Sequence, residues 1–440
     1  MKWQEKGWLK KYLTTRHHYV LHQEFQRLKD QKSTSAAFDQ LIYELMQATG
    51  LLYGYPAQMP YSYKTLLKSL KVDQLTDQQR WKILLLESLL NSALTTNRYH
   101  SLKREVDFAD AISEVTYRIG EYYVALYPNI KPKSRGGFLA RSSKTGIDFS
   151  EQALDARTQS MASNTKDEFW QAIMHSALSF IDVYCFHPWI QSYADTDKRE
   201  KVIKSHIRLR LLILYVLSSA AWANGIVEKE EKEFLEYFLT LSQLPEDLEE
   251  QGKKMILERV SMENIKWSEV KSPVLKRYLL ELATMIILSD KVISKSERQF
   301  LDELRDKLNL SEKETQHSIL AVESFVVEHW QNIPYLNGNK DVEAMTMYLL
   351  AKLRPYLQEE LPILKKYLEQ ESGVDALLQR SQIETIGTNE RKKIRQGLLA
   401  AIQATPAFQS AVVPRSVLTY SVLLETIPGG LFARYQPNNE

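Results

Sequence analysis

The chain carries one stretch of sequence twice, at a fixed offset of 66 residues. Residues 214–238 match residues 280–304 without a gap, and the match extends to Leu244 against Leu310. In each copy an apolar run ends at a short polar residue, and a glutamate-containing segment follows. Self-similarity at a fixed period is typical of a duplicated supersecondary unit. The pattern predicts two helix–acidic turn–helix hairpins, and it restricts the centre of the chain to a helical architecture.

The turn of each hairpin has a recognisable chemistry. The apolar run ends at Asn224 in the first copy and at Asp290 in the second. Asn and Asp tolerate the left-handed conformation that closes a helix, and Gly225 adopts a positive φ without steric cost. Val227 and Ile293 occupy equivalent places after the turn. We expect these β-branched side chains to fill the inside of their hairpins.

A glutamate follows each turn at the same distance. Glu231 and Glu297 come seven residues after the Asx position and are predicted in the first turn of the next helix. A carboxylate there faces the positive end of the helix dipole. Ser294, three residues before Glu297, completes a capping-box pattern. Two roles stay open for these glutamates: capping of their own helices, or a binding site for a metal or a partner.

The duplicated hairpin resembles the TerB family of tellurite-resistance proteins over about residues 200–330. The motif of that family is Ala-Asp-Gly-x-Ile/Val-x-x-x-Glu on a helical hairpin, usually present twice with pseudo-twofold symmetry. The resemblance implies an acidic site for a divalent cation, Ca²⁺ or Mg²⁺, with four ligands here: Asn224, Glu231, Asp290 and Glu297. The chain departs from the motif at Asn224, which replaces a carboxylate. It departs again at Lys291, which replaces the second glycine and places a cation beside Asp290.

Turn-forming residues are scarce in this chain. It has 15 glycines and 14 prolines in 440 residues, whereas all-β proteins need many such residues. We predict an all-α, multi-domain protein, because this length exceeds one ordinary core. Four parts are expected: an N-terminal helical region (1–128), a basic flexible linker (129–165), a TerB-like helical domain with a preceding helix (166–335) and a C-terminal helical region (341–440).

Two helix boundaries follow from residue chemistry. Thr76 with Gln79 three residues later is a capping box, and it precedes an apolar helix at residues 81–94. A second helix, at residues 169–186, is predicted to end near Pro188 because proline lacks the backbone N–H.

The predicted linker contains a basic segment. Residues 131–146 hold five basic residues, no acid, and many small or turn residues. Such a segment binds an anion or an acidic partner, or it is a solvated linker. No Walker pattern is present. The candidate anion- or partner-binding residues are Lys131, Lys133, Arg135, Arg141 and Lys144.

An enzyme is the alternative function. Cys185 is the single cysteine, so an intrachain disulfide is impossible. His175, Asp182 and His187 lie near it in sequence and suggest a metal- or cysteine-dependent site. Packing of Cys185 in the core is the competing interpretation.

Three N-terminal histidines form another candidate cluster. His18 and His22 are four residues apart, a spacing that can hold zinc, and His17 is adjacent. The sequence offers no further ligands nearby, which favours surface histidines.

The sequence predicts no transmembrane segment and no signal peptide. The longest apolar-rich run without charge, residues 211–223, spans only about 20 Å as a helix, which favours a buried core helix. We therefore expect a cytoplasmic protein, with peripheral contact to the inner membrane as an alternative. The net charge of +2 excludes a general attraction to nucleic acid, and no specific nucleic-acid motif is present.

The C-terminal segment resembles the ribosome-binding region of the LETM family. It has a basic capped helix at residues 388–402, then apolar stretches that contain Pro406, Pro414 and Pro428. Arg415 and Glu425 argue against a membrane span. Together with the TerB-like centre, this segment resembles bacterial LETM-related, biofilm-associated proteins. The hypothesis is a non-catalytic scaffold or sensor: the acidic hairpins bind a cation or a basic protein partner, and the tail docks on a ribosome or membrane.

Overall fold

The structure is a computed structural model of the chain. It describes residues 6–30, 39, 42, 64–71, 75–96, 102–127, 129–131, 144–159, 168–259, 261–267, 270–288, 294–329, 342–370, 373–405 and 420–426. Every regular element within these ranges is a helix, which confirms the predicted all-α class.

The chain divides into two compact units, Met1–Leu275 and Lys276–Glu440. The division falls inside α12 (Pro273–Leu288) and inside residues 166–335, for which the sequence predicts one domain. The helices of the first unit are α1 (Trp8–Asp30), α3 (Lys64–Leu70), α4 (Asp77–Leu94), α6 (Glu105–Leu126), α7 (Lys144–Gln159), α8 (Glu168–Gln191), α9 (Thr196–Ala221), α10 (Lys229–Ser242) and α11 (Glu246–Leu257). Those of the second unit, after α12, are α13 (Lys295–Leu308), α14 (Glu312–His329), α15 (Val342–Glu359), α16 (Leu361–Gln370), α17 (Val374–Ile383), α18 (Thr388–Gln403) and α20 (Tyr420–Thr426).

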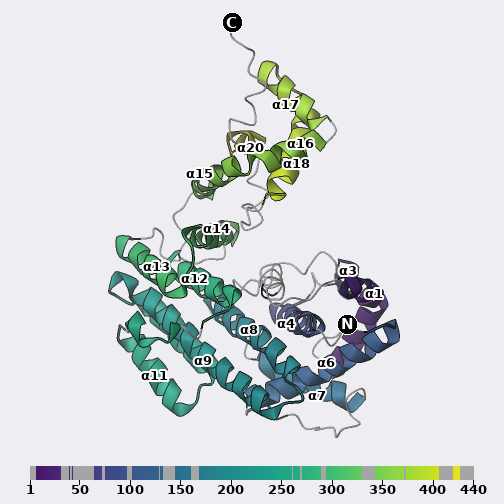
Figure 1. Cartoon of the computed structure of the whole chain (residues 1–440), viewed down its shortest axis with the longest axis vertical. Coiled ribbons are helices and arrows are strands. Elements are labelled where there is room, and N and C mark those ends of the chain that lie inside the picture. The colour runs from purple at the N-terminus through teal and green to yellow at the C-terminus, as the bar shows by residue number, and fades with distance from the viewer. Residues whose placement is uncertain are drawn as a thin grey trace. The chain divides into compact units, whose positions relative to one another are not determined.

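The first unit is built around α8, which packs against α4, α9 and α10. Figure 1 shows α8 beside α4 and α9. A helix that is apolar around its whole circumference belongs in a core, and α8 is buried along most of its length. The neighbouring helix α4 begins as predicted: the Thr76 side chain accepts from the Gln79 backbone N–H, and the Gln79 side chain accepts from Thr76 N–H. Helix α6 packs on α7, and α9 packs on α11.

The predicted stop at Pro188 is wrong. Helix α8 continues through Pro188 to Gln191. Proline removes a single intrahelical hydrogen bond, and near the C-terminal end few further turns depend on it. The backbone N–H of Ser192 still donates to the Pro188 carbonyl at 3.1 Å.

The flexible linker predicted for residues 129–165 is also wrong over 144–159, which form α7. Phe149, Ala153 and Leu154 lie at helical spacing and are buried. Glu151 accepts hydrogen bonds from the backbone N–H groups of Gly7 and Leu9, at 2.6 and 2.8 Å, and so caps the start of α1. The turn residues before position 144 favoured the prediction of a linker, although an apolar stripe of helical spacing follows them.

Helix α9 and the turn after it carry the most apolar long segment of the described chain. Within the described residues, Thr196–Asn224 is the one segment long and apolar enough to cross a membrane. However, 72% of its most apolar window is buried inside the protein.

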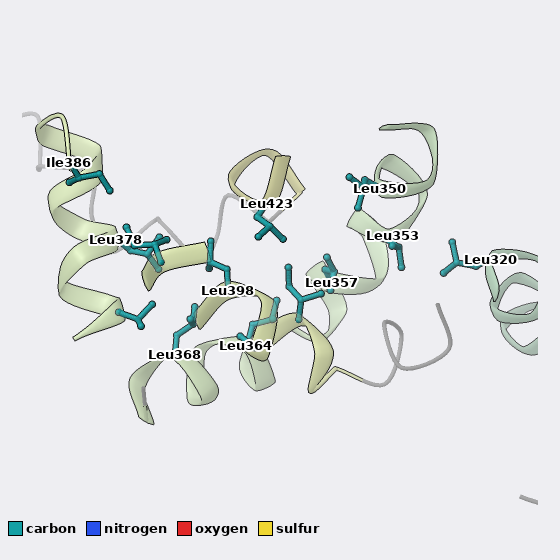
Figure 2. Close-up of a cluster of buried hydrophobic side chains, with 14 residues drawn as sticks. Leu320, Leu350, Leu353, Leu357, Leu364, Leu368, Leu378, Ile386, Leu398 and Leu423 are labelled. Atoms are coloured by element: carbon teal, nitrogen blue, oxygen red, sulfur yellow. The ribbon is translucent and has the colours of Figure 1, made fainter. Parts of the chain in front are cut away.

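The second unit has its own hydrophobic core. Figure 2 shows Leu357, Leu364, Leu398 and Leu423 directed toward a common interior between α15, α16, α18 and α20. The predicted basic helix of the C-terminal segment is α18, and it supplies four buried residues to this core: Ile394, Leu398, Ala401 and Ile402.

Candidate functional site

The first acidic hairpin joins α9 to α10 through a turn that is held by local hydrogen bonds. A short 3-10 segment, Trp222–Asn224, follows α9, and Gly225 then takes a φ of 93°. The Asn224 side-chain oxygen accepts from the Ile226 backbone N–H at 3.0 Å. Glu231 sits at the third position of α10 and accepts from the Glu228 N–H at 2.8 Å. Local hydrogen bonds therefore hold the turn, and Gly225 has the positive φ that the sequence predicts.

The described part of the second hairpin, from Ser294 onward, repeats the helix start of the first at the same offset. Helix α13 begins 66 residues after α10, and each helix ends at a left-handed residue, Gln243 and Asn309, with φ values of 44° and 51°. The Ser294 side chain accepts from the Glu297 N–H, and Glu297 accepts from the Ser294 N–H at 2.6 Å. Capping by Glu231 and Glu297 is thus present in both copies.

The predicted cation ligands of the first hairpin are few. Asn224 is exposed, whereas Glu231 is buried and reaches back to its own helix start. Hard cations take about six to eight oxygen ligands. Within the described residues no three His, Cys, Asp or Glu side chains come together as a metal-binding group. Asp290 and Lys291 lie outside the described residues, so a cation site depends on a residue whose position is not described.

The predicted basic segment is only partly described. Lys131 is exposed after α6, and Lys144 is the first residue of α7. Lys133, Arg135 and Arg141 lie outside the described residues.

The structure does not bring the residues of the alternative enzyme together around Cys185. His175 Nε2 lies 2.8 Å from the Tyr237 hydroxyl, whereas His187 donates from Nδ1 to the Ser92 carbonyl at 2.9 Å. Burial raises the pKa of the Cys185 thiol far above its usual range, which disfavours the nucleophilic thiolate. Burial also lowers the pKa of His187 to about 4. These side chains belong to the packed core.

Asp182 is the centre of a buried polar network that joins four helices. Its carboxylate is 0% exposed and accepts from Arg157 Nε of α7 at 2.8 Å and from His206 Nε2 of α9 at 2.9 Å. The hydroxyls of Tyr123 and Tyr127, at the end of α6, donate to it at 3.3 and 3.2 Å. Four donors therefore saturate one carboxylate.

The groups of this network differ in their ionisation at pH 7. Burial alone would raise the pKa of Asp182, but Arg157 and His206 outweigh it and hold the pKa at about 2. Burial lowers the pKa of His206 to about 4, so His206 is neutral at pH 7. A second guanidinium, from Arg210, lies over the Tyr127 ring with its central carbon 5.3 Å from the ring centroid, and donates to the Ser242 carbonyl. The network stabilises the packing of α6–α9 and has the character of a structural support.

Sequence reasoning missed the partners of Asp182, although a signal existed. A single acid within the apolar stretch of α8 cannot be buried without compensation. His206 and Arg210 are four residues apart and thus share one face of α9. This pairing predicts a buried ionic cluster, but the identity of the partner helices depends on the fold.

The N-terminal histidines lie on α1 without forming a zinc-like group. His22 Nδ1 is 2.8 Å from a Glu105 carboxylate oxygen, with both side chains largely exposed. His18 contacts the Tyr19 ring edge-on. Burial lowers the pKa of His17.

In comparisons with known proteins, no family model, curated protein or solved structure matches the chain.

Proposed function

We propose that the protein is a non-catalytic scaffold or sensor, and that the tip of the α9–α10 hairpin docks a basic partner segment. Exposure of Ile226 carries this proposal: its side chain is 70% exposed at the tip of the turn. The side chain stands between exposed Asn224 and exposed Glu228, on a backbone fixed by the Gly225 conformation and the capping box. A rigid turn presents this apolar group at low entropic cost, as partner recognition requires.

The charge around Ile226 selects the partner. Residues 228–236 contain five glutamates and two lysines. The lysines Lys229 and Lys232 face Glu233 and Glu236 along the helix, at 3.7 and 3.8 Å. The segment therefore has a net negative charge, and a partner with lysine or arginine beside an apolar residue is complementary to it.

Peptide binding tests this docking site. A fluorescein-labelled peptide rich in lysine and leucine is titrated with the full chain, and binding is followed by fluorescence anisotropy. We expect Ile226→Ser to weaken binding by about ten-fold or more, since burial of an Ile side chain contributes about 1.5–3 kcal/mol. Glu228→Lys is expected to act in the same direction.

Val106→Ser is the matched control for Ile226→Ser. Val106 is 63% exposed on α6 and lies outside the hairpin. Equal affinities of the wild type and the Ile226→Ser variant would refute the docking site. A photo-crosslinker at position 226, compared with one at position 106, then identifies the partner in cells.

The cation hypothesis has its own test. Ca²⁺ and Mg²⁺ are titrated calorimetrically into the wild type, an Asp290→Ala variant and a Glu297→Gln variant. Gln at position 297 preserves the reach to the Ser294 N–H and removes the charge, so folding is retained. Absence of heat in the wild type, or equal heat in all three proteins, would rule out the acidic turns as a cation site.

A second candidate function, ribosome docking by the C-terminal segment, is favoured by the basic surface of α18. Arg391, Lys392 and Lys393 are consecutive and exposed. Deletion of the segment would remove part of the second unit's core, so charge reversal is the better test. We expect Lys392→Glu with Lys393→Glu to abolish co-sedimentation with ribosomes, whereas Lys366→Glu on α16, also exposed, is the control.

A further inference from the structure

The first unit contains a concave pocket away from the hairpin tip. It lies between α9, α11 and the residues 264–266 and 270, and its volume is about 460 Å³. Small-molecule pockets in proteins have volumes of about 300–1,000 Å³, so this one suits a single small ligand and is too small for a packed helix.

The floor of the pocket is apolar. Leu209, Leu212 and Tyr215 reach it from α9, Met255 from α11, and Val270 from the connecting segment. Leu212 is only half-buried, although it lies in the apolar stretch of α9. Part of the uncovered apolar side of α9 therefore faces this pocket, and an apolar ligand would complete its burial.

The rim of the pocket is mainly cationic. Among its described lining residues are three basic side chains, Arg208, Lys254 and Lys266, and one acid, Glu258. All four are exposed at the surface. A rim of this sign attracts a negatively charged head group, while the floor accepts an apolar chain.

We propose that this pocket binds a single-chain amphiphile with a carboxylate head, such as a medium-chain fatty acid. The chain lies along the floor between α9 and α11, and the carboxylate lies at the lysine-bearing rim. Ser205, Gln251 and Asn264, which also line the pocket, supply polar groups for orientation. The pocket is separate from the hairpin tip, so the ligand proposal does not depend on the docking proposal.

Calorimetric titration of octanoate, decanoate and dodecanoate into the full chain tests the floor. The carboxylates are kept below their micelle concentrations. Each added methylene that enters the pocket is expected to raise the affinity by about four-fold, until the pocket is full. Absence of binding, or an affinity independent of chain length, would overturn the proposal.

A change of head group tests the rim. Dodecyltrimethylammonium is expected to bind at least about ten-fold more weakly than dodecanoate. Equal affinities for the two would overturn the proposal, and so would binding to phosphatidylglycerol vesicles without binding to monomeric dodecanoate. The latter result would assign the surface to membrane contact.

Two neighbouring lysines of α11 provide a matched pair of variants. Lys254 lines the pocket, whereas Lys253 forms an ion pair with Glu249 at 2.7 Å and does not line it. We expect Lys254→Glu to weaken dodecanoate binding several-fold and Lys253→Glu to leave it unchanged. Ser205→Trp, at an exposed lining position, is expected to fill the mouth and weaken binding at least about ten-fold. Equal effects of the two lysine variants, or wild-type affinity in Ser205→Trp, would overturn the proposal.

Discussion

Replacement of Asp182 by asparagine is the perturbation that tests the buried network most directly. Asparagine keeps the size of the side chain and removes its charge. Arg157 donates to one carboxylate oxygen and His206 to the other, so the NH₂ group of asparagine faces one of these two donors in place of an acceptor. The variant therefore leaves a buried guanidinium without its counter-charge.

Two independent estimates give the size of the effect. Removal of one partner from a buried ion pair costs about 3–5 kcal/mol. The pKa of Asp182, lowered from 3.8 to about 2, corresponds to about 2–3 kcal/mol of stabilisation of the ionised form. Against a total stability of about 5–15 kcal/mol for a domain, a loss near 3 kcal/mol is large.

Urea unfolding at pH 7, followed by tryptophan fluorescence, measures this loss. Seven of the eight tryptophans precede residue 276, so the signal reports mainly on the first unit. Asp182→Asn and Arg157→Met are measured singly and together. We expect the double variant to be about 2 kcal/mol more stable than the sum of the single effects predicts, because each single variant already breaks the same contact.

Additivity of the two substitutions, within about 0.5 kcal/mol, would refute direct coupling between Asp182 and Arg157. A loss below about 1 kcal/mol for Asp182→Asn would refute its role as a buried counter-charge. Glu249→Gln is the control, because Glu249 pairs with Lys253 at the surface, and its loss is expected to have no measurable effect.

Three further predictions concern pH, glycine and capping. The pKa of His206 falls from 6.5 to about 4 on burial, so in this interval the unfolded chain binds a proton that the folded chain does not. The corresponding stability, about 3 kcal/mol, is complete above pH 6.5 and is lost as pH falls to 4; urea unfolding that is unchanged between pH 7 and 4.5 would contradict this. Gly225→Ala, whose new Cβ would meet no atom within 4 Å, should lose only about 1 kcal/mol to its positive φ, whereas at Gly120 a Cβ would lie 2.7 Å from the Phe149 ring and the loss should be larger. Urea unfolding that ranks these two variants in the opposite order would contradict the packing of α6 on α7. Glu297→Ala should reduce stability by about 1 kcal/mol, and by more than Glu297→Gln, which keeps an acceptor for the Ser294 N–H; equal losses in thermal unfolding would contradict the capping box.

Local chemistry made several features predictable from the sequence. The capping boxes at Thr76 and Ser294 need only residues three apart in the chain, and both are present. The positive φ of Gly225 depends on the same short range. Because these hydrogen bonds and dihedral angles involve neighbouring residues, no knowledge of the packing was necessary.

The wrong predictions concern segments where a local sequence signal for the end of a helix is outweighed by long-range packing. Pro188 and the turn-rich stretch before position 144 both suggested an end to helical structure, yet α8 continues to Gln191 and α7 follows that stretch. The apolar residues of α7 pack against α6, and that burial stabilises the helix beyond what its own propensity provides.

The sequence by itself determined the helical class, the repeat at an offset of 66 residues and the glutamates that cap the start of α10 and α13. Only the tertiary structure decided which residues meet Asp182: Arg157 is 25 residues away in the chain, His206 is 24 away and Tyr127 is 55 away. It also decided that α9 and α11 enclose a pocket with a cationic rim. The physical reason is the range of the forces. Capping and turn geometry are fixed within a few residues, whereas the partner of a buried charge depends on which helices pack together.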